Sequence, residues 1–400
     1  MIKNNIQYKQ KINILKNVVL KTRFKGGILH GLYNEVINNP PADYKIIIPH
    51  EIEKSILGNI TFQVNSNFYK KILYQFGALP YLNTQLRKKI DYDNCDLIFS
   101  AQHIIKTKKP WIVDLEFVNA LAGYCNIYLV KNLISKTLRT KECKYILPWS
   151  NWGAKTMLDS IDCTGFEDKI KVVRYTVSPK KIDRSKKNNI RMLFVGSINQ
   201  CGKMREMFKG LYENVEAFIQ LQDKYDNLEL VIRSSVPTEI RKKVSKYSNI
   251  KIIDNLLSPS ELEELYLSAD IFPHVGYEAL NLSTLEAMSY GIPVIVTNLY
   301  NIPEAVTHMK NGMLIDLPNS ELLYTKNGCP NEYSNPPTDV IKKFRSKIIE
   351  KTKESMVKLI EDTSFRNNIG REAIQTINKG EFSIQHRNSL LKEIFDEATK

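Results

Sequence analysis

Short apolar segments alternate with amphipathic helical segments along the second half of the chain. The predicted strands lie at residues 191–197, 228–233, 250–254, 271–275, 293–297 and 312–316. One helix has apolar residues at Leu211, Val215 and Phe218, and another opens with Ser258 as N-cap and Glu261 three residues later, a capping-box signature. Short apolar strands separated by helices predict a parallel sheet that is covered on both faces.

The first half repeats this alternation with weaker signals. Its predicted strands lie at residues 12–20, 44–49, 96–101, 111–116, 145–150 and 169–175. Helices are expected between them, including a long one after Glu116. The polar and charged run 178–189 has no periodicity, and we interpret it as a linker. A long basic helix is expected at about 339–361 and a final helix at 384–398.

A length of 400 residues suits two domains of this kind better than one. We predict an N-terminal Rossmann-like domain over residues 1–185, a C-terminal Rossmann-like domain over 186–375, and a C-terminal helix within 376–400 that packs back on the first domain. Open α/β sheets bind ligands at the carboxyl ends of their strands, so two facing sheets predict an enzyme with its site in a cleft.

Charge divides the chain unevenly. The formal net charge is +14, yet residues 1–190 hold 31 Lys and Arg against 15 Asp and Glu, whereas residues 191–400 hold 26 against 28. The basic half is suited to anionic lipid, a phosphorylated substrate or nucleic acid, unless it reflects only a lysine-rich composition. Dispersed cations without a recognised motif argue against nucleic acid.

Cysteine spacing and hydropathy bear on location. The six cysteines form no C-x-x-C pair, so we expect a reducing compartment and neither a zinc site nor a disulfide framework. The N-terminus lacks the apolar core of a signal peptide, and the uncharged run 117–130 is too short to cross a bilayer. We expect a cytoplasmic protein and leave open its attachment to the inner face of a membrane.

Two glutamates interrupt an otherwise apolar stretch after the strand at 271–275. Glu278 lies in the loop past the strand, and Glu286 lies in a helix predicted to begin at Ser283 and to end at Gly291. Ser283 and Glu286 have capping-box spacing, so Glu286 could merely cap its own helix, and Glu278 could be a solvated loop residue. The functional alternative directs both carboxylates into the cleft at the mouth of one helix.

That alternative favours one class of ligand. A helix N-terminus attracts phosphate, whereas carboxylates repel phosphate and accept hydrogen bonds from neighbouring hydroxyls. A molecule with a central diphosphate and a hydroxyl-rich ring at each end satisfies both demands. The two glutamates therefore indicate a nucleotide sugar.

The stretch PHVGYEALNLSTLEAMSYGIPVIVTNLYNIPEAVTHMKNGMLI, residues 273–315, resembles the donor-site signature of the retaining family-4 glycosyltransferases, the glycosyl transferases group 1. The likeness lies in E-x7-E, in the following E-A-M-x-x-G-x-P-V, and in the later P-E-x-V and N-G. Weaker similarity covers most of the chain, including the glycine-rich loop in residues 25–36. The resemblance implies a GT-B fold, in which two Rossmann-like domains face a central cleft.

The resemblance also implies roles for individual residues. Glu278 would contact hydroxyls of the donor sugar, Glu286 would hold the ribose, and Lys209 would neutralise the diphosphate. Further contacts with the donor are implied at Gly26, Gly27, Gly196, Asn281, Leu282 and Ser283.

Three departures from the family pattern stand out. The loop after the first glutamate reads E-A-L-N in place of E-G-F-G, and Asn281 is suited to a left-handed backbone there. Ser197 stands where an arginine is usual, and either Arg205 or Arg233 supplies the missing charge. Glu116 takes the position of a histidine in the first domain, where it serves catalysis or pairs with a nearby lysine.

The reaction that the resemblance implies is retaining transfer of a sugar to a glycan or lipid-linked acceptor. No D-x-D occurs in a plausible donor loop, so we expect chemistry without a metal or other cofactor, in which cations and a helix N-terminus stabilise the leaving diphosphate. The basic first half favours an anionic acceptor. The alternatives are an inactive GT-B sugar-binding or scaffold protein, a sugar phosphorylase and a nucleotide-sugar epimerase.

Overall fold

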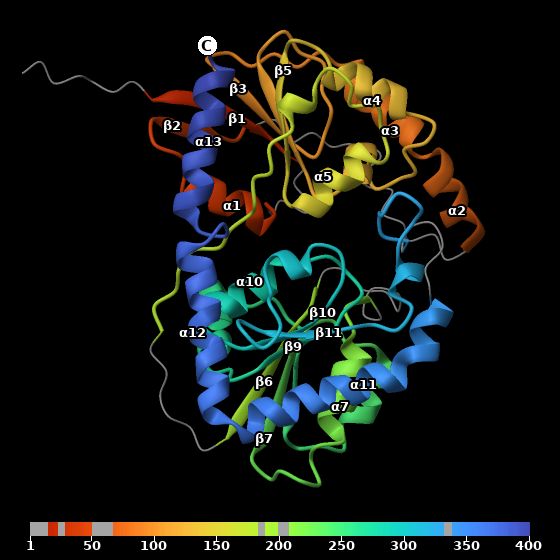
Figure 1. Cartoon of the computed structure of the whole chain (residues 1–400), viewed down its shortest axis with the longest axis vertical. Helices are drawn as coiled ribbons and strands as arrows, with labels where there is room; N and C mark the ends of the chain where they lie inside the picture. Colours follow the sequence, from red (N-terminus) through yellow and green to blue (C-terminus); the bar gives the residue numbers. More distant parts are fainter. Residues whose placement is uncertain (1–14, 23–28, 50–66, 183–188, 199–207, 332–337) are drawn as a thin grey trace, which may run out of the picture.

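The computed structural model describes residues 15–22, 29–49, 67–182, 189–198, 208–331 and 338–400, apart from the side chains of 67–71. It contains two α/β parts, one above the other in Figure 1, with helices α12 and α13 along one side. Every strand pairing in both parts is parallel within this described portion, which confirms the predicted α/β class with parallel sheets.

The first sheet has five strands in the order β2-β1-β3-β4-β5. They are β1 (Lys16–Lys21), β2 (Tyr44–Ile47), β3 (Leu97–Ala101), β4 (Trp111–Leu115) and β5 (Cys143–Pro148). Val18 of β1 lies opposite both Ile46 of β2 and Leu97 of β3, so the strand order reverses at β1. In such sheets the crevice at the carboxyl ends beside the reversal is where ligands bind.

The second part contains two three-stranded sheets, ordered β6-β7-β8 and β11-β10-β9. The strands are β6 (Ile190–Val195), β7 (Leu228–Arg233), β8 (Ile250–Ile253), β9 (Phe272–His274), β10 (Val294–Thr297) and β11 (Met313–Ile315). A bridge from Met192 to Ile271, with Leu193 N donating to Ile271 O at 3.0 Å, joins β6 to β9. The order of this combined sheet therefore reverses between β6 and β9, and their carboxyl ends meet there.

Helices connect the strands. They are α1 (Gly31–Asn38), α2 (Asn67–Phe76), α3 (Ala78–Arg87), α4 (Lys131–Leu138), α5 (Asn151–Leu158), α7 (Leu211–Ile219), α8 (Thr238–Val244), α9 (Pro259–Leu267), α10 (Leu282–Ser289), α11 (Thr338–Glu361), α12 (Thr363–Lys379) and α13 (Ile384–Ala398). Four short 3-10 helices are η2 (Val118–Ala122), η3 (Glu167–Lys169), η4 (Ile302–Glu304) and η5 (Ser320–Leu323). The predicted capping box of Ser258 and Glu261 is confirmed at α9. Among the described helices, none has both the length and the apolar character needed to cross a membrane.

Two sequence predictions of secondary structure are wrong. Residues 169–175 form no strand, because they pair with β5 only through an isolated bridge at Ile146. The long helix expected after Glu116 is the short 3-10 helix η2, since Gly123 and Tyr124 follow it with φ of 66° and 64°. Two successive residues in the left-handed region cannot continue a right-handed helix.

The last helix joins the first part of the molecule. Tyr44 donates its hydroxyl proton to Asp396 of α13 at 2.7 Å. The buried Arg387, also on α13, donates to Thr176 Oγ1 at 2.9 Å and to the Asn39 carbonyl at 2.7 Å. In Figure 1, α13 lies beside the first sheet and α12 beside the second, so the two helices span both parts.

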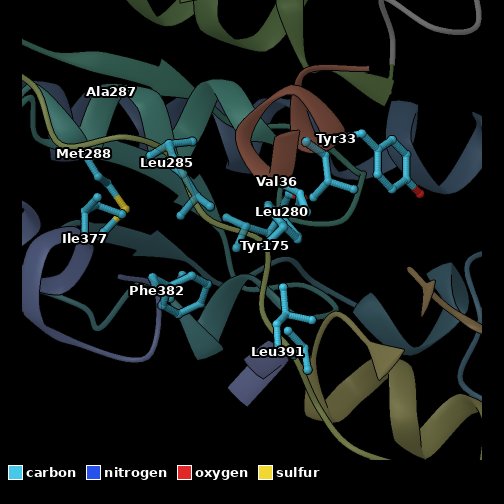
Figure 2. Close-up of a cluster of buried hydrophobic side chains, with 14 of the residues drawn as sticks. Tyr33, Val36, Tyr175, Leu280, Leu285, Ala287, Met288, Ile377, Phe382 and Leu391 are labelled. Carbon is cyan, nitrogen blue, oxygen red and sulfur yellow. Dashed lines mark hydrogen bonds between the residues drawn. The ribbon is translucent and has the colours of Figure 1, made fainter. Parts of the chain in front are cut away.

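A buried hydrophobic cluster lies where the two parts meet. Figure 2 labels ten of its side chains, which come from α1, α10, α12, α13 and the segments between elements: Tyr33, Val36, Tyr175, Leu280, Leu285, Ala287, Met288, Ile377, Phe382 and Leu391. A Cβ built on Gly31 at the start of α1 would lie 3.3 Å from Leu282 at the start of α10. The N-termini of α1 and α10 are therefore in direct contact.

Candidate active site

The predicted donor-site residues converge on the carboxyl ends of β6 and β9. Gly196 and Ser197 follow β6, Lys209 precedes α7, and the loop 275–281 leads from β9 into α10. This edge contains the reversal of strand order, which is the place where an open α/β sheet holds its ligand.

Glu278 is the centre of a polar cluster at this edge. Its Oε1 lies 2.7 Å from Lys209 Nζ, 3.1 Å from Asn281 Nδ2 and 3.3 Å from His274 Nε2. The side chains of Glu278 and Lys209 are 22% and 14% exposed, so the pair is sheltered but still reaches the surface. All three contacts use Oε1, and no described residue donates a hydrogen bond to Oε2.

The neighbours of Glu278 set its charge. Burial raises the pKa of its carboxyl, but the Lys209 ammonium and the hydrogen bond from His274 outweigh burial and hold this pKa well below its usual range. Burial lowers the pKa of His274, whose ring is stacked on Phe194 with centroids 5.1 Å apart. The neutral ring donates its Nε2 proton, so at neutral pH the cluster holds an ionised carboxylate beside an ammonium.

The N-cap of α10 is Asn281, so the predicted capping box of Ser283 and Glu286 is wrong. Asn281 Oδ1 accepts from Thr284 N at 2.9 Å and from Ser283 Oγ at 2.7 Å, while its Nδ2 donates to Glu278. A cap at Ser283 would give up these three bonds. The Asn281 backbone is extended, with φ of −108°, and the expectation of a left-handed residue there is also wrong.

Glu286 lies inside α10, beyond the capping positions, and therefore does not cap its own helix. Its Oε2 accepts from the Tyr266 hydroxyl at 2.8 Å. Burial raises the pKa of Glu286, the Tyr266 bond and the cations Lys180 and Arg233 reduce that rise, and Glu35 adds to it. Glu35 belongs to α1 and Lys180 to the segment between the two parts, so Glu286 faces the junction of both.

Arg233, at the end of β7, is one of the two cations that act on Glu286, the other being Lys180. Its Nη1 donates to the Gly196 carbonyl at 3.1 Å, and its Nε is buried with no hydrogen-bond partner among the described residues. Burial lowers the pKa of Arg233, while Tyr266 and Glu286 raise it. A guanidinium with an unused buried N–H at a strand end is suited to bind an anion.

Only some of the other predicted donor-site residues lie in the described part of the chain. Ser197, at the position of the usual arginine, accepts a hydrogen bond from Ser235 N through its carbonyl at 3.1 Å. Arg205, Gly26 and Gly27 lie outside the described residues. Of the two candidates for the missing charge, Arg233 is the one within the described residues, where it donates to the Gly196 carbonyl. That it supplies the charge stays a prediction.

Gly210 holds Lys209 in place. It is the N-cap of α7 with φ of 68°, and a Cβ there would overlap the Val275 carbonyl. The start of α7 thus lies against the loop after β9, which lets Lys209 reach Glu278, 69 residues further along the chain. Only glycine combines this backbone conformation with this close approach.

An ion pair between α7 and α11 lies close to the loop that contains Glu278. Arg345 Nε of α11 donates to Glu213 Oε1 of α7 at 2.8 Å, and the Glu213 side chain is fully buried. Burial raises the pKa of Glu213, and Arg345 opposes this effect. The Glu213 carboxylate in turn helps burial to raise the pKa of Tyr277, the residue before Glu278.

Arg345→Ala should destabilise the protein by about 3 kcal/mol near pH 8, because it leaves the Glu213 carboxylate buried without its cation. The pKa of Glu213 is raised in the folded state, so the stability that its protonation adds is present at low pH and is lost as the pH rises through that pKa. Urea unfolding should therefore show a smaller loss at about pH 5 than at about pH 8. An equal loss at both would contradict this account, and Arg241→Ala, which breaks an exposed pair with Asp254, is the control.

Glu116 faces the loop of Glu278 from the first part. It follows β4, and its Oε2 lies 3.0 Å from the Tyr124 hydroxyl. Tyr175 donates its hydroxyl proton to the Leu280 carbonyl, and both Glu116 and Glu278 help burial to raise the pKa of Tyr175. The two carboxylates therefore act on one tyrosine at the junction.

Sequence reasoning missed Asp114, a buried carboxylate beside the site. It accepts hydrogen bonds from Tyr33 at 3.1 Å, from Trp149 Nε1 at 2.9 Å and from Gln102 N at 2.9 Å. Burial raises the pKa of Asp114 to about 6. A single charged residue in the apolar strand WIVDL was the available signal. Tyr266 and Lys180 were also missed, and nothing in their local sequence marks them.

Residues 181–326 match the family model described as Glycosyl transferases group 1. The match is a similarity of this segment, which is less than half of the chain. Lys209, Arg233, Glu278 and Glu286 all lie within the matched segment.

Other known proteins are similar to this chain in sequence or in fold. A protein of 41.2 kDa from the cps region of Klebsiella pneumoniae is 23% identical over 329 residues, which cover 73% of this chain and 83% of that protein. The structure of Anabaena HepE with UDP and glucose is similar over 96% of this chain and 99% of its own, with a TM-score of 0.56 and 13% identity. WaaG, a glycosyltransferase involved in lipopolysaccharide biosynthesis, is similar over 96% and 100%, with a TM-score of 0.57 and 14% identity. The predicted GT-B fold is thereby confirmed.

Proposed function

We propose that this protein is a retaining, metal-independent glycosyltransferase of the family-4 type, which moves a sugar from a nucleotide sugar to a glycan or lipid-linked acceptor. The observation that carries the proposal is the grouping of Glu278 with Lys209 and of Glu286 with Arg233 around the start of α10. Carboxylates accept hydrogen bonds from sugar hydroxyls, and cations with a helix N-terminus hold a diphosphate.

Each carboxylate has an oxygen left for substrate. Oε2 of Glu278 receives no hydrogen bond from the described residues, and it accepts from hydroxyls of the donor sugar. Oε1 of Glu286, the oxygen that Tyr266 does not use, accepts from the ribose. Lys209 and Arg233 stabilise the charge that develops on the leaving diphosphate, which is the role a metal has in other transferases.

The acceptor enters from the first part in this proposal. Residues 1–185 bind the acceptor, residues 186–375 bind the donor, and 376–400 pack back on the first domain. Glu116 lies on the acceptor side of the junction, close to Tyr175 and the Leu280 carbonyl. The anomeric configuration is retained in this proposal. The leaving phosphate takes the proton of the acceptor hydroxyl, which removes the need for a strong protein base.

The excess of positive charge in residues 1–190 supports an anionic acceptor at the inner face of a membrane, with the protein in the cytoplasm. WaaG, which shares the fold, is involved in lipopolysaccharide biosynthesis, and the Klebsiella relative lies in a cps region. Both fit an acceptor of the lipid-linked glycan class.

Thermal shift with nucleoside diphosphates tests the proposal directly. UDP, GDP and ADP are compared first, and then their sugars with a labelled glycosyl group. We expect one of the three bases to stabilise the protein and its nucleotide sugar to be hydrolysed or transferred. HepE was solved with UDP, so UDP is tried first. Stabilisation by none of the three would contradict the proposal, and binding without turnover would favour the inactive sugar-binding alternative.

Arg233→Ala should weaken binding of the nucleoside diphosphate by roughly 10- to 100-fold, because a charged hydrogen bond to phosphate is lost. Isothermal titration with the diphosphate and with the free nucleoside separates binding of the phosphates from binding of the base and ribose, since only the diphosphate should lose affinity. Arg191→Ala is the matched control, because its partner Glu229 lies at the opposite end of the same two strands. Equal weakening of both ligands would place Arg233 outside the phosphate site.

A further inference from the structure

Six of the twelve large hydrophobic side chains that are exposed in the described part of the chain lie on α2, on α3 and at the start of α4. They are Ile72, Phe76, Leu79, Tyr128, Leu129 and Leu133, with exposures from 39% to 70%. We call this set the α2–α4 face. Burying such side chains is favourable, so their concentration on one face calls for a partner.

The elements of the α2–α4 face are joined to one another. Asn126 N donates to the Tyr74 carbonyl at 2.7 Å, and Asn126 Nδ2 donates to Gln75 Oε1 at 2.7 Å. Asn126 Oδ1 also accepts from Tyr128 N at 2.9 Å, which orders the turn that exposes Tyr128. Figure 1 shows α2, α3 and α4 along the same side of the first part. The exposed side chains therefore form one surface.

Charge identifies the partner. The segments 67–90 and 117–141, which contain these helices, hold nine Lys and Arg and no Asp or Glu in the sequence. Arg87 continues the exposed row of Leu79 on α3, and Lys136 follows Leu133 on the same face of α4. Two of these cations are paired with neighbouring carboxylates, Lys89 with Asp91 and Arg139 with Asp162, and the remainder leave an excess of positive charge. Exposed apolar side chains among excess cations match the interface of an anionic bilayer, which offers a hydrocarbon boundary beneath phosphate groups.

The α2–α4 face is also connected to the candidate active site, through Tyr124 and Glu116. Its segment 126–129 begins two residues after Tyr124, whose hydroxyl lies 3.0 Å from Glu116 Oε2. We propose that the α2–α4 face docks on an anionic lipid bilayer and presents a membrane-held acceptor to the side of Glu116. Presentation of the acceptor rests on the proposed function, whereas docking itself does not.

Flotation of the full chain with vesicles tests the docking. One set of vesicles is pure phosphatidylcholine and the other also contains phosphatidylglycerol. We expect the wild type to float with the anionic vesicles, and the double variant Phe76→Ser, Leu129→Ser to lose about tenfold or more of that binding. Arg87→Gln with Lys136→Gln should lose binding to the anionic vesicles in the same way. The controls are Leu256→Ser with Leu322→Ser, which are equally exposed in the second part, and Lys242→Gln.

Each of the following results would overturn the docking surface. One is flotation of the Phe76, Leu129 double variant at the wild-type level, and another is equal flotation with neutral vesicles. A third is a wild-type dimer in light scattering that this variant converts to monomer without changing flotation, which would make the face an interface between copies. Thermal shift with nucleoside diphosphates should be the same in all variants. Docking that persists in a protein binding no nucleotide would refute the proposed function and leave the surface intact.

Discussion

Lys209→Ala should lower kcat/KM for sugar transfer by roughly 10²- to 10³-fold, because it removes the fixed cation nearest to the proposed leaving group. The Lys209 ammonium lies 2.7 Å from Glu278 Oε1 and is the strongest influence that lowers the pKa of Glu278 against burial. Its loss lets the pKa of Glu278 rise, so the variant loses both the cation and part of the ionised carboxylate. Steady-state kinetics with the nucleotide sugar found by thermal shift measures the effect.

The structural part of this effect can be separated from the chemical part. Removing Lys209 leaves a sheltered carboxylate without its cation, which should cost about 1–3 kcal/mol of unfolding free energy. The double variant Lys209→Ala, Glu278→Gln removes the charge as well, so it should recover stability but no turnover. Lys224→Ala breaks an exposed pair with Glu361 and should leave activity and stability nearly unchanged. Full activity in Lys209→Ala would refute the proposed role.

Glu286→Gln should lower kcat/KM by roughly 10²-fold with little change in stability. The amide still offers an oxygen to the Tyr266 hydroxyl, which now donates to Oε2 at 2.8 Å, so the packing of α10 is kept. What is lost is the charge that accepts two ribose hydroxyls, together with the attraction of Lys180 and Arg233 for this position. Affinity for the nucleoside diphosphate, measured by titration calorimetry, should fall in parallel with turnover.

The outcome also distinguishes a contact with the donor from a purely structural role of Glu286 in α10. If Glu286 served only α10, its replacement would lower the melting temperature and leave nucleotide affinity unchanged. The control is Glu263→Gln, because Glu263 likewise accepts a tyrosine hydroxyl, that of Tyr290 at 3.3 Å, but lies on α9 outside the site. Equal affinity in wild type and Glu286→Gln would remove the carboxylate from the donor site.

The positions of most strands were predictable, because a strand that is buried on both faces is a short, nearly continuous run of apolar residues. The segment 169–175 has the same composition, yet it makes only one bridge, since pairing depends on the neighbouring strand as well as on the run itself. The break at Gly123 and Tyr124 was not predictable either, because a tyrosine with positive φ is imposed by its surroundings and has no signature in the sequence.

In the site, Glu278 and Glu286 were found because two carboxylates in an apolar segment after a strand need an explanation. Their partners were harder to find. The cap of α10 was assigned to Ser283, since serine and asparagine are equally good caps, and only the bond from Asn281 to Glu278 decides between them. Asp114 was not recognised as a site residue, because it lies within a predicted apolar strand.

The sequence by itself determined the alternation of strands and helices, the two carboxylates past β9 and the basic first half, because these depend on neighbours along the chain. Only the tertiary structure decided that Lys209 reaches Glu278 across 69 residues, that Arg233 bonds to the Gly196 carbonyl beside Ser197, and that Glu35 and Lys180 lie near Glu286. Those contacts arise when parallel strands bring distant loops to one edge, and the spacing of residues along the chain does not encode which loops will meet.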